Sequence, residues 1–155
     1  MCFKRKGFKS PYLKDGRLAD VIAGLQILGS YKWASREAAS WASKLDDDSK
    51  TEKWREIFTE HPEFFRINGE WASLRWRHAL DKDYDPENEI IVKRQDTKGL
   101  TRRPLDPAQI EALINTAVEL HNRAIEHEKE RRWLTPILFS FLGIVIGVIL
   151  QAALK

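Results

Sequence analysis

The residues best suited to binding a charged partner lie in two short runs, 63–67 and 70–77. Period-two alternation along these runs places three arginines and two aromatic residues on one face. Guanidinium groups can hold phosphates or carboxylates, and an aromatic ring can stack on a base or fill a pocket in a protein. The candidate partner-binding or nucleic-acid-binding residues are therefore Phe64, Arg66, Trp71, Arg75 and Arg77.

The charge of a neighbouring helix favours a protein partner over nucleic acid. The sequence predicts a helix over 49–61. In a DNA-binding domain with this order of helices and a hairpin, that helix would enter the major groove. Its outward residues are net acidic and would repel phosphates: they are Glu52, Lys53, Arg55, Glu56 and Glu60. Nucleic-acid binding is the alternative. A structural alternative also exists, in which the arginines form cation–π pairs with Trp71 on a solvated sheet face.

No arrangement of residues in the sequence indicates catalysis. His121 and Glu128 are seven residues apart on one predicted helix, but two ligands do not complete a metal site. Residues 46–48 are three aspartates without the ligand spacing of a calcium loop. A single cysteine, Cys2, excludes an intrachain disulfide and fits a reducing compartment. We therefore expect a protein that is not an enzyme and needs no metal or cofactor.

The overall composition and net charge exclude few further classes of protein. The chain has 155 residues, with 26 Lys and Arg against 23 Asp and Glu, and the net charge of +3 does not mark a nucleic-acid-binding protein. Charge is nevertheless unevenly placed: residues 1–14 are basic without an acid, whereas 81–89 are mainly acidic. The first region is predicted to be a basic arm.

Local signals predict the elements that position the candidate surface. Helices are expected over 16–28, 35–45 and 49–61, with a short β-prone stretch at 31–33. The Asn68-Gly69 dipeptide predicts a hairpin with a two-residue turn. That turn would pair Ile67 with Glu70 and Phe65 with Ala72.

This order of elements resembles a winged helix-turn-helix over residues 11–78. The runs His61-Pro62-Glu63-Phe64-Phe65-Arg66 and Trp71-Ala72-Ser73-Leu74-Arg75-Trp76-Arg77 also look like those of a set of small uncharacterised bacterial proteins. Members of that set end in a Glu/Arg-rich helix, a tryptophan and one membrane span. The resemblance implies a winged-helix-like domain at 15–78 and a C-terminal membrane anchor.

The following segments are predicted to be a linker and an amphipathic helix. Residues 79–106 lack clear periodicity, although 89–93 could add an edge strand. Apolar positions spaced by three and four predict a helix over 107–132 that packs on its own domain or joins a stalk bundle. These positions are Ile110, Leu113, Ala117, Leu120 and Ala124.

An uncharged run over 137–154 predicts a single transmembrane helix at 133–155. Its length as a helix, about 27 Å, approaches the thickness of a bilayer core. Flanking positive charge places the N-terminus in the cytoplasm, with the protein in the cytoplasmic (inner) membrane. The expected membrane-surface residues are Lys4, Arg5, Lys6, Lys9, Arg131, Arg132 and Trp133.

Small and polar residues in this run predict contact between two copies of the helix. They are Ser140, Gly143, Gly147 and Gln151. The expected fold is mainly α with one β-hairpin: a winged-helix-like domain, a long amphipathic helix and a transmembrane helix. The leading hypothesis is a membrane-tethered adaptor that self-associates and binds a cytoplasmic protein. The alternatives are a membrane-bound nucleic-acid-binding regulator or sensor and a small membrane effector of a defence system.

Overall fold

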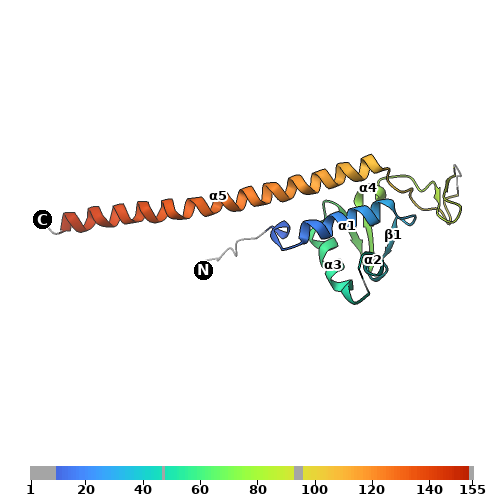
Figure 1. The fold of residues 1–155 in the computed structure, drawn as a ribbon, viewed down its shortest axis with the longest axis horizontal. Helices are drawn as coiled ribbons and strands as arrows, with labels where there is room; N and C mark the ends of the chain where they lie inside the picture. Colours follow the sequence, from blue (N-terminus) through green and yellow to red (C-terminus); the bar gives the residue numbers. More distant parts are fainter. Residues whose placement is uncertain (1–9, 47, 93–95, 154–155) are drawn as a thin grey trace.

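A computed structural model describes residues 10–46, 48–92 and 96–153, with side chains described as far as residue 130. Three helices pack against a three-stranded antiparallel sheet, and a much longer helix crosses them (Figure 1). The first part comprises the 3₁₀ turn η1 (Pro11–Leu13), α1 (Arg17–Ser30), β1 (Ser35–Glu37), α2 (Ala38–Leu45), η2 (Asp48–Lys50), α3 (Thr51–Glu60), β2 (Phe65–Asn68) and β3 (Trp71–Leu74). It is followed by α4 (Arg75–His78), β4 (Tyr84–Asp85), β5 (Ile90–Ile91) and α5 (Pro107–Ala153).

The predicted order of helix, strand, helix, helix and hairpin is present, but the first strand lies later than expected. The stretch 31–33 is not a strand, and β1 uses residues that the sequence assigned to the start of the second helix. Strand β3 lies between β1 and β2, so β1 is held by pairing with a distant segment. Ser35 pairs with Ser73 and Glu37 with Trp71. A strand specified by its partner rather than by its own residues gives little local signal.

The hairpin is present, with a turn one residue further along the chain than predicted. Asn68 pairs with Trp71 and Ile67 with Ala72, which leaves Gly69 and Glu70 as the turn residues. Gly69 has a positive φ of 59°, whereas Glu70 does not. A turn with φ > 0 at its first central position alone is of the II′ kind, in which glycine occupies that position. The predicted cross-strand partners are thus wrong by two residues, but an even shift leaves each side chain on its predicted face.

The core lies between the inner sheet face and helices α1, α2 and α3. Its largest fully buried apolar side chains are Trp41, Trp54, Phe58, Phe65, Leu25 and Leu28. The rings of Phe58 and Phe65 lie 4.9 Å apart, which joins α3 to β2. Close packing of these side chains makes the sheet a rigid support for whatever its outer face carries.

Helix α5 begins where the sequence predicts and packs on its own domain. The Asp106 carboxylate accepts a hydrogen bond from the Gln109 amide at 2.8 Å, and the Gln109 side chain accepts one from the Asp106 amide at 3.1 Å. This reciprocal capping box satisfies two backbone donors and defines the start of the helix. The predicted apolar positions of α5 contact the core, and Gly29 allows Ile110 to approach α1 closely. The structure therefore shows this seam packed within the domain.

The predicted fold class is corrected at its C-terminal part. Residues Pro107–Ala153 form one uninterrupted helix, so the segments 107–132 and 133–155 are not two separate helices. Over the part of the chain that the structure describes, no helix is sufficiently long and apolar to cross a membrane. The described turns of α5 instead alternate core-facing apolar residues with exposed charged ones, as in an amphipathic helix on a domain surface. The fold class that included a transmembrane helix is therefore wrong.

The segment predicted to be a linker contains a small hairpin. Tyr84 pairs with Ile91 and Asp85 with Ile90. Tyr84 also exchanges backbone hydrogen bonds with Thr101, of 3.1 and 2.8 Å. These bonds return the chain to the domain and bring the residues around Arg102 next to α4.

Candidate binding surface

The outer face of the sheet is open to solvent and carries a tryptophan. Alternation along the three strands places six residues on this face, which we call the outer sheet face: Ser35, Glu37, Arg66, Asn68, Trp71 and Ser73. Trp71 is 51% exposed, the most exposed tryptophan for which the structure describes the side chain. Arg66 is exposed beside it and pairs with Ser73 on the neighbouring strand. Both residues thus lie where the sequence predicts.

Phe64 does not belong to this surface. It is only 3% exposed, and its ring packs edge-on to Phe65 with 6.3 Å between centroids. The chain reverses just before β2: the amides of Phe64 and Phe65 both donate to the carbonyl of His61, at 3.1 and 3.0 Å. Strand alternation therefore does not extend to residue 64, and the prediction of Phe64 as an exposed binding residue is wrong.

Arg77 is also structural rather than a binding residue. Its side chain is fully buried. Nη1 donates to the carbonyls of Leu28 at 2.9 Å and Tyr31 at 2.6 Å, and Nη2 donates to that of Arg102 at 2.6 Å. Burial lowers the pKa of Arg77 to about 10, which leaves it charged at neutral pH. The chain leaves strand geometry at Arg75 and enters α4, so the predicted alternation ends and Arg77 points inward.

Arg75 is exposed, as predicted, and lies in a group of basic residues. We call this group the basic cluster: Arg66, Arg75, His78, Lys82 and Arg102. Burial lowers the pKa of His78, and the charges of the other four members lower it further. Arg66 Nη1 is hydrogen-bonded to Nε2 of His78. The cluster thus continues the outer sheet face across α4 and onto the chain after it.

The sequence missed three of these residues. His78, Lys82 and Arg102 lie at or beyond the end of the predicted hairpin, and two of them are in the segment assigned as a linker. Arg102 Nε donates to the carbonyl of Leu80 at 3.0 Å, and this contact brings it back to α4. The cluster is therefore a product of a long-range contact, for which the sequence carries no local signal.

Helix α3 keeps its predicted acidic surface, in part neutralised by the N-terminal turn. Lys14 pairs with Glu56 and Glu60, and the guanidinium of the buried Arg17 lies 3.1 Å from the same two carboxylates. Lys14 and Arg17 therefore bind carboxylates of α3 and are not free to bind a ligand.

A second polar group joins η1, the end of α3 and α5. The Tyr12 hydroxyl donates to Glu63 at 2.6 Å, and Nδ1 of the buried His61 lies 3.1 Å from the same oxygen. Nδ1 of His121 lies 3.0 Å from the carbonyl of Tyr12. Burial would raise the pKa of Glu63, but the hydrogen bonds from His61 and Tyr12 outweigh it and lower that pKa. Burial, with the Glu63 hydrogen bond, raises the pKa of Tyr12.

The Glu63 interaction predicts a pH-dependent contribution to stability. The folded-state pKa lies below the ordinary 4.5, so this contribution is present above that value and is lost as the pH falls through the folded-state pKa. Glu63→Gln should lower the free energy of unfolding at pH 7 by about 0.5–1.5 kcal/mol, reduced from the fully buried case because the side chain is 35% exposed. Urea unfolding at pH 7, 5 and 3 measures this change in stability. Glu52→Gln is the control because Glu52 is exposed. If the difference in unfolding free energy between wild type and Glu63→Gln stayed constant down to pH 3, the stability would not depend on the ionisation of Glu63.

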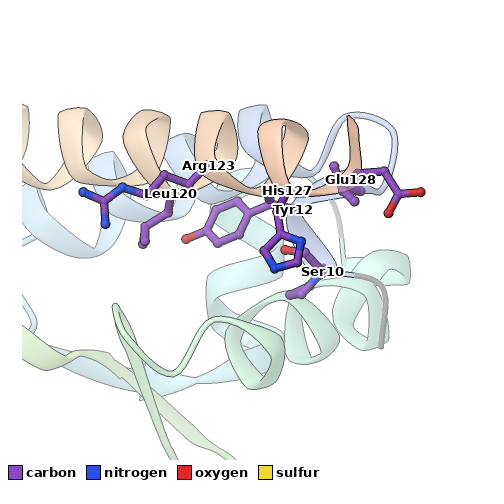
Figure 2. Close-up of a pocket in the computed structure, with 9 residues that line it drawn as sticks. Ser10, Tyr12, Leu120, Arg123, His127 and Glu128 are labelled. Atoms are coloured by element: carbon purple, nitrogen blue, oxygen red, sulfur yellow. The ribbon is translucent and has the colours of Figure 1, made fainter. Parts of the chain in front are cut away.

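A pocket of about 440 Å³ lies between η1 and α5. Figure 2 shows Leu120, Arg123 and His127 of α5 beside Ser10 and Tyr12 of the N-terminal turn. Its rim includes Arg123 and Glu128, one charge of each sign. The pocket therefore selects no ion by charge, in contrast to the basic cluster.

Several predicted residues lie outside the described part of the chain or have side chains outside it. For the membrane surface these are Lys4, Arg5, Lys6, Lys9, Arg131, Arg132 and Trp133, and for helix association Ser140, Gly143, Gly147 and Gln151. Among the described residues, no three His, Cys, Asp or Glu side chains are placed to hold a metal ion. Comparison with known protein families, curated proteins and solved structures finds no match for this chain.

Proposed function

We propose that this chain is a non-enzymatic adaptor that binds a protein partner through the outer sheet face. The observation that carries the proposal is the exposure of Trp71. Trp41 and Trp54, in the same domain, are almost completely buried, whereas Trp71 exposes half of its surface. An indole on a rigid sheet offers a large apolar contact at low entropic cost, and tryptophan and arginine are enriched among the residues that dominate binding energy.

The surroundings of Trp71 favour protein over nucleic acid. Its partner on β1 is Glu37, an exposed carboxylate directly opposite it. A nucleic-acid backbone that stacked a base on Trp71 would bring phosphates towards this carboxylate. A protein surface can instead supply a cation to Glu37 and a carboxylate to Arg66.

Replacing Trp71 by alanine tests the proposal. Loss of a central anchor should weaken binding by at least about 2 kcal/mol, roughly 30-fold, while the stability changes by less than about 0.5 kcal/mol because the side chain is half exposed. Affinity capture with the full-length protein, followed by titration of the captured protein, measures the first effect, and thermal unfolding measures the second. Ile90→Ala is the matched control, since Ile90 is 53% exposed on a different hairpin. Equal capture by wild type and Trp71→Ala would refute the proposal.

Nucleic-acid binding is the second candidate, and the basic cluster is the observation that favours it. Four cations that each replaced a counterion would make the logarithm of the affinity fall with the logarithm of salt concentration with a slope of about −3 to −4. Titration of the full-length protein with duplex DNA between 50 and 200 mM salt measures this slope. Absence of salt-dependent binding would eliminate this candidate.

A further inference from the structure

Two arginines of the basic cluster are held in place with their terminal groups free. Arg75 Nε donates to the carbonyl of Pro62 at 2.7 Å, and Arg102 Nε donates to that of Leu80 at 3.0 Å. Within the described part of the chain, the Nη atoms of both residues make no hydrogen bond. A guanidinium anchored through Nε and open at its terminal edge is preorganised to bind an oxyanion with two donors.

His78 adds a donor to the same cluster. A guanidinium has no acceptor, so Nε2 of His78 must accept the hydrogen bond from Arg66, and the imidazole proton lies on Nδ1. Burial and the four neighbouring cations lower the pKa of His78 and so favour the neutral ring. A bound anion would offset the charge of the cations, so that Nε2 could release the Arg66 bond and take up a second proton.

Within the described part of the chain, the cations of the cluster have no carboxylate partner. Among the described residues, Arg66, Arg75, Lys82 and Arg102 form no ion pair. Other cations of the domain do: Lys14 and Arg17 pair with α3, and Lys53 pairs with Asp20 at 2.8 Å. Like charges placed together without partners cost stability, so this arrangement indicates a site that an anion completes.

We infer that the basic cluster binds a phosphate dianion carried on a side chain of the protein partner. This inference rests on the proposed function and gives it a chemistry: the partner presents a phosphorylated residue beside the segment that contacts Trp71. Carboxylates flank the cluster: Glu37 lies opposite Trp71 on β1, and Asp81 and Asp83 are the neighbours of Lys82 in the sequence. A single dianion matches a group of cations bounded in this way, whereas an extended polyanion would run onto these carboxylates.

Inorganic phosphate is the first probe. The pKa of His78 in the full-length protein is measured by NMR with and without phosphate. Phosphate should raise the pKa of His78 by more than sodium chloride does at equal ionic strength, because sodium chloride only screens the neighbouring cations. The double variant Arg75→Gln/Arg102→Gln should abolish the shift while the protein remains folded by thermal unfolding. Arg66→Gln serves as the second variant if the double one unfolds. A His78 titration that phosphate shifts no more than sodium chloride does in the wild type would overturn the inference.

Peptides distinguish the source of the phosphate. A glycine–alanine peptide with one phosphoserine should bind at least tenfold more tightly than its unphosphorylated serine counterpart, and inorganic phosphate should compete with it. Duplex DNA that binds more tightly than the phosphopeptide, and displaces it, would overturn the assignment to a protein side chain. Trp71→Ala should retain phosphate binding. Failure of the phosphate site and failure of the adaptor proposal are therefore separate results.

Discussion

Replacing Arg77 by alanine is expected to lower the free energy of unfolding by about 3–5 kcal/mol. The guanidinium donates to backbone carbonyls from two segments: Leu28 and Tyr31 at the end of α1, and Arg102 before α5. The last carbonyls of a helix have no partner within the helix, and a cation there is also favoured by the helix dipole. Alanine leaves these acceptors buried and unpaired and opens a cavity.

Thermal and urea unfolding measure this effect, with an expected fall in melting temperature of about 10 °C or more. Arg77→Lys keeps the charge but lacks the planar fork that reaches Arg102 and Leu28 together, so it should recover only part of the loss. Arg66→Ala is the matched control because Arg66 is exposed, and its effect should stay within about 0.5 kcal/mol. Equal stabilities of Arg77→Ala and Arg66→Ala would show that the buried bonds contribute nothing net.

Replacing Trp41 by alanine should also cost about 3–5 kcal/mol. Trp41 is completely buried between α2 and the sheet. Its Nε1 donates to the carbonyl of Ala72 at 2.9 Å, and its ring lies edge-on to Tyr31 with 5.6 Å between centroids. Alanine removes a large apolar area, leaves a void and deprives a central strand of one hydrogen bond.

The matched control is the same substitution at Trp71, which lies one residue before the carbonyl that Trp41 contacts. Trp71→Ala should leave the urea midpoint nearly unchanged because half of the side chain is already in water. The pair thus compares a core tryptophan of α2, which is hydrogen-bonded to β3, with a surface tryptophan of β3 itself. A loss of stability at Trp71 as large as that at Trp41 would place Trp71 in the core and remove the basis of the adaptor proposal.

Features that depend on residues close together in the chain could be predicted from the sequence. The capping residues Asp106 and Gln109 are three apart, and α5 begins beside them. Apolar spacing of three and four predicted the face of α5 that packs on α1. Gly69 predicted the hairpin, although the turn lies one residue later, because a turn with positive φ at its first central position also accepts glycine.

Features that depend on where a strand ends were predicted wrongly. Alternation places Phe64 and Arg77 beside Arg66 and Trp71, yet the strands stop at Phe65 and Leu74. Beyond those ends the backbone turns, and both side chains enter the interior. The apolar run near the C-terminus likewise predicted a separate membrane helix, whereas α5 is a single helix that is amphipathic over residues 107–130.

The order of the elements, the outward position of Trp71 and Arg66, and the start of α5 are determined by the sequence itself, because periodicity, turn residues and caps act over a few neighbours. Only the tertiary structure decided that Arg77 is a buried support and that Arg102 joins Arg75 and His78. The carbonyls that hold Arg77 and Arg102 come from residues 22 to 49 positions away along the chain. A local pattern cannot encode which distant backbone will supply an acceptor, and the basic cluster exists only once those segments meet.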